Sequence, residues 1–233
     1  YKRQIGAKWV RIQSGWERTE QEKGVYDFEW LDSIVDNLLE RGLVPWINLA
    51  YGNGLYDDDA AKVFGAVGCP PVKSEEAKKG WADYITALAA HMKGRISYYE
   101  VWNEPDGEWC WKHGPNGKEY GQFVVDTSVA LKKGDSSAKV IGGAICMAKP
   151  LDFAYDAFSV GMGEHIDAIS FHEYVIDETV VFRHVKALRG LCNRFNPNIE
   201  IIQGESGSQS RSDGRGAMRK GAWTPHKLSL IHI

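Results

Sequence analysis

The stretch SYYEVWNEP, residues 97–105, joins a run of β-favouring residues to an abrupt polar ending. Tyrosine, valine and tryptophan favour a strand, and Pro105 lacks the backbone N–H that a central strand needs. The strand is therefore expected to end on Asn103 and Glu104, where the backbone leaves the sheet. Because α/β proteins keep their chemistry at the carboxyl ends of strands, this stretch predicts an α/β fold with a polar site here.

Segments of similar composition recur along the chain, and nearly every one precedes a segment whose apolar residues recur at helical spacing. The expected strands occupy residues 8–13, 44–51, 97–104, 139–144, 166–174 and 199–205. One intervening helix is expected to end at Gly42, which suits a left-handed cap, and another to run from a Ser74 N-cap to Gly94. The repeated strand and helix predict a parallel sheet.

Parallel strands joined by helices form either an open doubly wound sheet or a closed (β/α)8 TIM barrel. A doubly wound nucleotide-binding protein should carry a glycine-rich turn after an early strand, and IQSGWERTE, residues 12–20, contains neither that turn nor a P-loop. Nearly every expected strand instead ends in polar or aromatic side chains, namely Gln13, Trp16, Asn48, Tyr51, Asn103, Glu104, His172, Tyr174, Glu205 and Ser206. Convergence from many strand ends favours the barrel.

A complete barrel has eight strands and typically about 250 residues, whereas six expected strands fill this chain of 233 residues. We therefore expect a single barrel domain over residues 1–233 that is incomplete and lacks the first and eighth strands. A complete, open six-stranded sheet is the alternative.

Composition excludes several classes of partner. A formal net charge of −3 without a basic cluster indicates neither nucleic-acid nor membrane-surface binding, and no run approaches the length of a membrane span. Nine tryptophans are the outlier, and flat indole faces suit sugar rings. Four cysteines lack metal-ligand spacing, so buried thiols are favoured and a disulfide stays open. No cofactor or metal motif is present, and neither the oligomeric state nor the cellular location is indicated.

Glu104 and Glu205 each end an expected strand, about a hundred residues apart, so that a barrel could bring them face to face. Hydrolysis of a glycosidic bond needs such a pair: one carboxylic acid protonates the leaving oxygen, and the other carboxylate attacks the sugar or activates water. The two groups must differ in pKa. We expect Trp102 and Trp109 to shield Glu104, and Arg11 and Tyr174 to donate to Glu205.

Four segments resemble the clan A glycoside hydrolases, which are retaining (β/α)8 enzymes. EVWNEP, residues 100–105, is similar to their acid/base strand, and IIQGESG, residues 201–207, to the strand that carries their nucleophile. AISFHEY, residues 168–174, resembles the strand before the nucleophile. The opening segment, residues 6–32, resembles family 39 β-xylosidases, and the similarity extends to about Pro225.

The resemblance implies that Glu104 is the general acid/base and Glu205 the nucleophile, in a retaining hydrolase that cleaves β-glycosidic bonds of a glycoside or oligosaccharide. The residues expected to bind substrate or support the catalytic pair are Asn103, His172, Tyr174, Arg11, Trp109, Trp111 and Tyr51. Glu173 should point to the opposite strand face from His172, so that HEY is not a metal site.

Two departures from the family pattern are visible in the sequence. The strand that would give the family's sugar-binding aromatic residue is missing, and after GAWTPHK, residues 221–227, the chain does not continue as the family's amphipathic helix. We treat residues 226–233 as a non-native tail, from truncation or a changed reading frame. The alternatives to a β-xylosidase are a non-catalytic carbohydrate-binding protein of the same fold and an endo-acting β-glycanase.

Overall fold

The computed structural model describes residues 6–62, 64–146, 151–174 and 178–206. Its single sheet has six strands, and every neighbouring pair is parallel. The strands are β1 Trp9–Gln13, β2 Val44–Leu49, β3 Tyr98–Val101, β4 Lys139–Cys146, β5 Ala168–His172 and β6 Glu200–Glu205. All six expected strands are confirmed, although β3 stops before Asn103. The expected tail, residues 226–233, lies outside the described residues.

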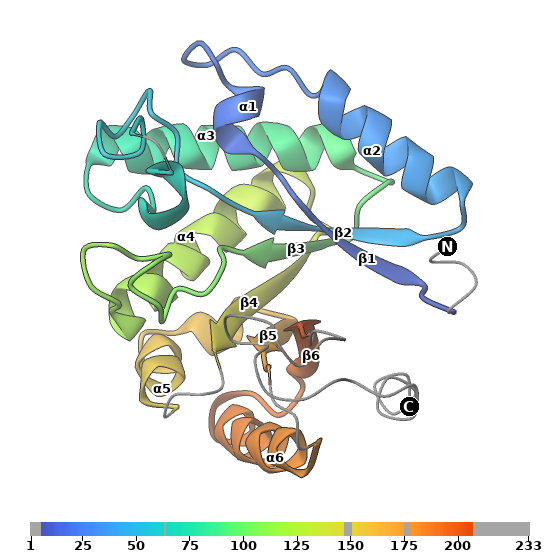
Figure 1. The fold of residues 1–233 in the computed structure, drawn as a ribbon, viewed down its shortest axis with the longest axis vertical. Helices are drawn as coiled ribbons and strands as arrows, with labels where there is room; N and C mark the ends of the chain where they lie inside the picture. The colour runs from blue at the N-terminus through green and yellow to red at the C-terminus, as the bar shows by residue number, and fades with distance from the viewer. Residues whose placement is uncertain (1–5, 63, 147–150, 175–177, 207–233) are drawn as a thin grey trace, which may run out of the picture.

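The strands follow one another in the sheet in the order of the chain, from β1 to β6, without the reversal of a doubly wound sheet. Five strand spacings would separate β1 from β6 by about 24 Å in a flat sheet. Arg11 of β1 nevertheless lies with Nη1 3.5 Å from Oε2 of Glu205 in β6. The sheet is therefore curled, and the described residues form six strands of an incomplete (β/α)8 barrel (Figure 1).

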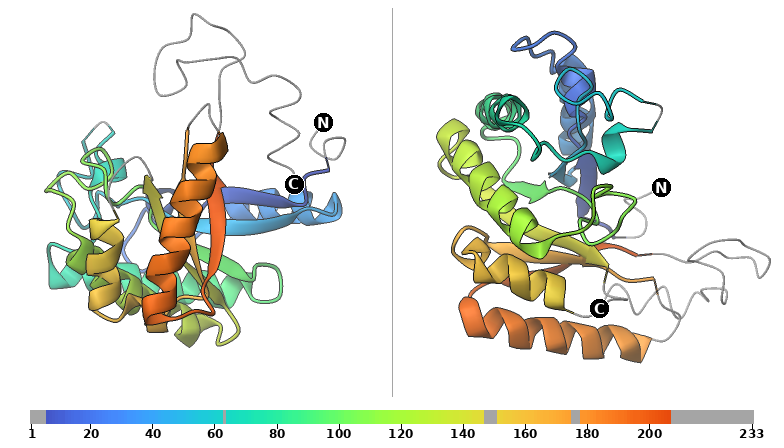
Figure 2. Two further views of the ribbon diagram at one scale, coloured as in Figure 1. Left: turned by 90° about the horizontal axis from the view of Figure 1, so that it is seen from below. Right: turned by 90° about the vertical axis from the view of Figure 1, so that its left-hand side faces the viewer.

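Helices connect the strands and cover the outside of the curl, as the right-hand view of Figure 2 shows for α3 to α6. The α-helices are α1 Trp16–Thr19, α2 Glu29–Glu40, α3 Glu75–Met92, α4 Gly117–Gly134, α5 Asp152–Ser159 and α6 Glu178–Phe195. Short 3₁₀ turns occupy η2 Ala66–Gly68 and η3 Met162–Glu164. No helix in these segments is long and apolar enough to cross a membrane.

The expected helix boundaries have the predicted chemistry. Ser74 caps α3, because its hydroxyl accepts a hydrogen bond from the Ala77 amide at 3.1 Å. Gly42 and Gly94 follow α2 and α3 with φ values of 69° and 81°, the left-handed backbone that glycine adopts at low cost. Sequence therefore determined where these two helices begin or end.

The main core lies between the strands and helices α2 to α5. It contains Trp81, Leu88, Trp102 and Phe123, each at most 5% exposed. The Trp81 indole donates to the Thr127 hydroxyl at 2.9 Å, which satisfies a buried polar atom between α3 and α4. All four cysteines are free, and all except Cys146 are buried. This core supports the strand ends on which the polar residues lie.

Candidate active site

Asn103 and Glu104 reach the same site because the backbone turns after β3. Side chains alternate between the two faces of a regular strand. Trp102 and Glu104, however, have left-handed φ values of 66° and 44°. Such a conformation costs a non-glycine residue about 1–3 kcal/mol and is concentrated at functional sites. The turn brings Asn103 to Arg11 and Glu104 to His172.

A bulge in β4 fixes the position of Glu104. The register of β4 against β5 shifts between Gly142 and Ile145, and Gly143 has a φ of 101°. A Cβ at Gly143 would lie 2.3 Å from the Ser170 carbonyl oxygen, so only glycine fits there. The bulge presents the Ala144 carbonyl, which accepts the Glu104 amide at 3.0 Å.

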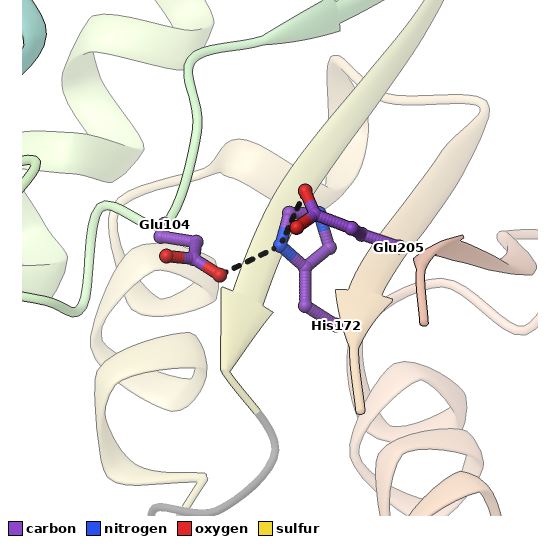
Figure 3. A group of neighbouring side chains, drawn as sticks. All are labelled: Glu104, His172 and Glu205. Carbon is purple, nitrogen blue, oxygen red and sulfur yellow. Dashed lines mark hydrogen bonds and ion pairs between the residues drawn. The ribbon is translucent and has the colours of Figure 1, made fainter. Parts of the chain in front are cut away.

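His172 lies between the two glutamates at the ends of the strands (Figure 3). Its Nδ1 is 3.0 Å from Oε1 of Glu104 and 3.6 Å from Oε2 of Glu205. One polar atom from each of the three side chains lies within 4.8 Å of the others. The His172 side chain is fully buried, whereas those of Glu104 and Glu205 are 16% and 39% exposed. A ligand at this position would therefore meet both carboxylates.

The surroundings of Glu104 differ from those expected. Burial raises the pKa of this carboxyl, but its hydrogen bonds with His172, Trp109 and Cys146 together lower it below its ordinary value. Trp109 gives a donated N–H rather than apolar shielding. Trp102 packs in the core, with its indole N–H on the Cys110 carbonyl. The expected shielding by these two indoles is therefore wrong, because one donates to the carboxylate and the other is directed away.

Glu205 has the two donors that were expected. The Tyr174 hydroxyl donates to its Oε1, and Arg11 Nη1 lies 3.5 Å from its Oε2. Burial is the main cause that raises the pKa of the Tyr174 phenol, followed by its hydrogen bond to Glu205. Both contacts hold the Glu205 carboxyl in place at the end of β6.

Arg11 also organises the polar interior beneath the two glutamates. Its Nη2 donates to Asn103 Oδ1 at 2.8 Å, and its Nε donates to Glu100. Glu100 is fully buried and also accepts from Asn48 at 3.0 Å. Glu100 and Asn48 were not among the predicted site residues. A charged residue in the middle of a buried strand was the signal that could have identified Glu100.

Besides Tyr174, three predicted aromatic residues have different positions. Trp109 is 53% exposed and donates its indole N–H to Glu104. Tyr51 is partly buried within hydrogen-bond distance of Gln13, and burial raises the pKa of its phenol to about 12. Trp111 is fully buried among core rings, with its N–H on Glu119. The prediction that Trp111 lies over the cleft is wrong, because the core covers its faces.

Known proteins resemble this chain in sequence. The sequence profile of Glycosyl hydrolases family 39 matches residues 3–188, which include Glu104 and His172 but end before β6. A "Beta-xylosidase" of Caldicellulosiruptor saccharolyticus is 30% identical over 192 residues, which are 75% of this chain and 38% of that protein. A "Beta-xylosidase" of Geobacillus stearothermophilus is 29% identical over 163 residues, 65% of this chain and 31% of that protein. The chain thus spans less than two fifths of these relatives.

Solved structures resemble the fold. A family 39 enzyme from Xanthomonas axonopodis pv. citri matches 89% of this chain and 46% of its own, with a TM-score of 0.73 and 19% identity. A family 39 β-xylosidase from Caulobacter crescentus matches 91% of this chain and half of its own (50%), with a TM-score of 0.71 and 22% identity. The match of the family profile over residues 3–188 shows that the chain belongs to glycoside hydrolase family 39.

Proposed function

We propose that the protein is a retaining glycoside hydrolase that cleaves β-glycosidic bonds by double displacement, with β-xylosides as its first substrate class. The observation that carries this proposal is the approach of two carboxylates: an oxygen of Glu104 and one of Glu205 lie within 4.8 Å. Retaining glycosidases hold their carboxyl groups about 5–5.5 Å apart, whereas inverting enzymes need about 6.5–9.5 Å to admit a water. The spacing therefore supports direct attack on the sugar.

In the first displacement, Glu205 attacks the anomeric carbon while Glu104 gives its proton to the leaving oxygen. The C–O bond to the leaving group breaks, and an ester bond to Glu205 forms. Arg11 and Tyr174 donate to Glu205 and hold its carboxylate in position for the attack. Asn103, held by Arg11, would meet the sugar 2-hydroxyl, a contact that strengthens in the transition state.

In the second displacement, Glu104 is ionised and accepts a proton from water as the water attacks the same carbon. The ester to Glu205 breaks, and the sugar leaves with its original anomeric configuration. Burial raises the pKa of Glu104, but the hydrogen bonds that Trp109 and Cys146 donate lower it and so favour this ionised form. The exposed Trp109 indole would stack on a sugar ring beside the site.

β-Xylosides are the proposed substrate class because the chain belongs to family 39 and both curated relatives are named beta-xylosidases. An indole accepts almost any pyranose, so the aromatic residues alone do not select xylose.

The nucleophile is tested by Glu205→Ala in the full-length natural protein, assayed with an aryl β-xyloside. Turnover should fall by about 10⁴-fold or more, since the covalent step is lost. Added azide should restore turnover and give the α-configured glycosyl azide. Ordinary activity in this variant would contradict the assignment.

Glu200→Ala is the matched control, because Glu200 begins the same strand at its opposite, exposed end. It should keep near-normal turnover and show no azide effect. If the unmodified protein binds xylo-oligosaccharides without cleaving any glycoside in a panel of substrates, a carbohydrate-binding role replaces catalysis.

A further inference from the structure

Two buried polar atoms beneath the catalytic pair lack hydrogen-bond partners. They are Oε1 of Glu100 and Nε2 of His172, and neither has a partner among the described residues. Leaving a buried polar atom unpaired costs free energy, and for a charged group the cost is larger. Both side chains are fully buried, so bulk water does not reach them. Each of these two atoms therefore needs a hydrogen-bond partner.

Gly204 shows that the two atoms flank the same small space. A Cβ built on Gly204 would lie 3.1 Å from Glu100 Oε1 and 3.3 Å from His172 Nε2. A buried donor and a buried acceptor that face the same small space are matched for a direct hydrogen bond with each other. Glycine at position 204 keeps this space open.

The other oxygen of Glu100 is already committed. Glu100 Oε2 accepts from Arg11 Nε and from Asn48 Nδ2. An ionised carboxylate only accepts hydrogen bonds, so the free Oε1 requires a donor. His172 Nε2 is the atom that can supply one, provided that this nitrogen carries the proton.

We propose that Glu100 is a positioning residue that fixes the proton of His172 on Nε2, so that Nδ1 accepts a hydrogen bond from the protonated carboxyl of Glu104. This inference rests on the proposed function of Glu104 as the acid. A neutral imidazole has one N–H and one acceptor nitrogen, so holding the proton at Nε2 leaves a lone pair at Nδ1. That lone pair, 3.0 Å from Glu104 Oε1, stabilises the carboxylic acid form before the first displacement.

The proton balance is simple. During the first displacement the Glu104 proton moves to the leaving oxygen, and the Nε2 proton of His172 stays on its ring. In the second displacement Glu104 regains a proton from the attacking water, and the hydrogen bond to Nδ1 forms again. Glu100 stays ionised throughout and keeps its bond with Arg11.

Other titratable groups also face His172 from the surrounding elements. They are Glu104 after β3, Glu205 in β6, Arg11 in β1, Cys146 in β4 and Tyr174 after β5. The space at Gly204 is instead lined by Glu100 and His172. The test therefore changes Glu100 and that space while it leaves these groups in place.

Glu100→Gln should reverse the tautomer. The amide oxygen of glutamine would take the position that accepts from Arg11 and Asn48, so its NH₂ group would point at His172 Nε2. Nε2 must then accept, the proton moves to Nδ1, and Glu104 is favoured in its ionised form. The alkaline limb of kcat/KM should move down by about one pH unit, which is about tenfold lower activity above that limb.

Imidazole ¹⁵N NMR of the full-length protein reads the tautomer without any turnover, so it stays decisive even if no glycosidase activity is found. In the unmodified protein Nε2 should be the protonated nitrogen near neutral pH, and in Glu100→Gln it should be Nδ1. An unprotonated Nε2 in the unmodified protein, or an unchanged tautomer in the variant, would overturn the proposal.

Two further variants separate this role from a structural one. Gly204→Ala fills the shared space without changing charge, and it should weaken the preference for Nε2 even if Glu100→Gln fails to fold. Glu20→Gln removes another fully buried carboxylate, which accepts from Trp16 and Tyr56 outside the site. This control should lower the thermal midpoint and leave the His172 signals and the alkaline limb unchanged.

Discussion

Glu104 and Glu205 have the same side chain and lie close together after β3 and at the end of β6, yet their surroundings differ. Glu104 is 16% exposed and lies on a strained turn, where Trp109 donates to it and His172 Nδ1 lies at hydrogen-bond distance. Glu205 is 39% exposed at the end of β6, which is an edge of the described sheet. Its donors, Tyr174 and Arg11, come from the segment after β5 and from β1 at the opposite edge of the sheet.

The difference teaches how one fold can give two carboxylates separate roles. Both groups that form hydrogen bonds with the Glu205 carboxylate, the Tyr174 hydroxyl and the Arg11 guanidinium, donate to it. The partner of Glu104, in contrast, is a histidine that can either donate or accept at Nδ1. In the tautomer proposed above Nδ1 accepts, and it therefore favours the protonated form of the Glu104 carboxyl.

The largest expected effect separates the two carboxylates by their dependence on the leaving group. Glu104→Ala should lower kcat/KM by about 10²–10⁴-fold for xylosides with poor leaving groups, because these need a proton in the first step. Activated aryl xylosides should lose much less. The measurement is kcat/KM across a series of leaving groups, beside Glu205→Ala. Equal losses across the series for Glu104→Ala would contradict its role as acid.

A smaller effect is expected when a donor to Glu205, the more exposed of the two carboxyls, is removed. Tyr174→Phe removes the phenol that donates to Glu205, and hydrogen bonds to charged groups are worth about 1.5–3 kcal/mol. We expect kcat/KM to fall by about 10–100-fold with an aryl xyloside. Tyr155→Phe on the outer helix α5 is the control and should leave activity unchanged. Similar losses in both variants would indicate a general effect on folding.

The sequence predicted the strands and the approach of the two glutamates because both depend on local and repeating patterns. The spacing of apolar residues and the residue types typical of turns locate the strands, and parallel strands bring their carboxyl ends together. The partners of the glutamates depend instead on backbone details such as the left-handed turn at Trp102 and the bulge at Gly143. No residue-type pattern encodes these two features directly.

The two tryptophans of the loop after β3 show the same limit of prediction from sequence. Trp109 and Trp111 are two residues apart and were both expected to line the cleft. Trp109 is 53% exposed and donates to Glu104, whereas Trp111 is fully buried and donates to Glu119. Composition indicates that indoles are present, and only the turns between them decide which one reaches the site.

The smallest expected effect uses this pair of tryptophans. Trp109→Phe removes a donor that lowers the pKa of Glu104, so that pKa should rise and the alkaline limb of kcat/KM should move to higher pH. Because Trp109 is half exposed, water replaces part of the lost hydrogen bond, and the shift should be less than about one unit with only a few-fold change at the optimum.

Trp111→Phe, two residues further along the chain, should lower stability and leave the pH profile unchanged. It leaves a cavity in the core and removes the hydrogen bond to Glu119, which should cost about 1–3 kcal/mol of unfolding free energy. Its alkaline limb should stay where it is, because Trp111 makes no contact with Glu104 in the structure described here. Denaturant unfolding and pH profiles of both variants test the pair. A shifted limb in Trp111→Phe, or an unchanged one in Trp109→Phe, would show that the indole at Glu104 does not tune the acid.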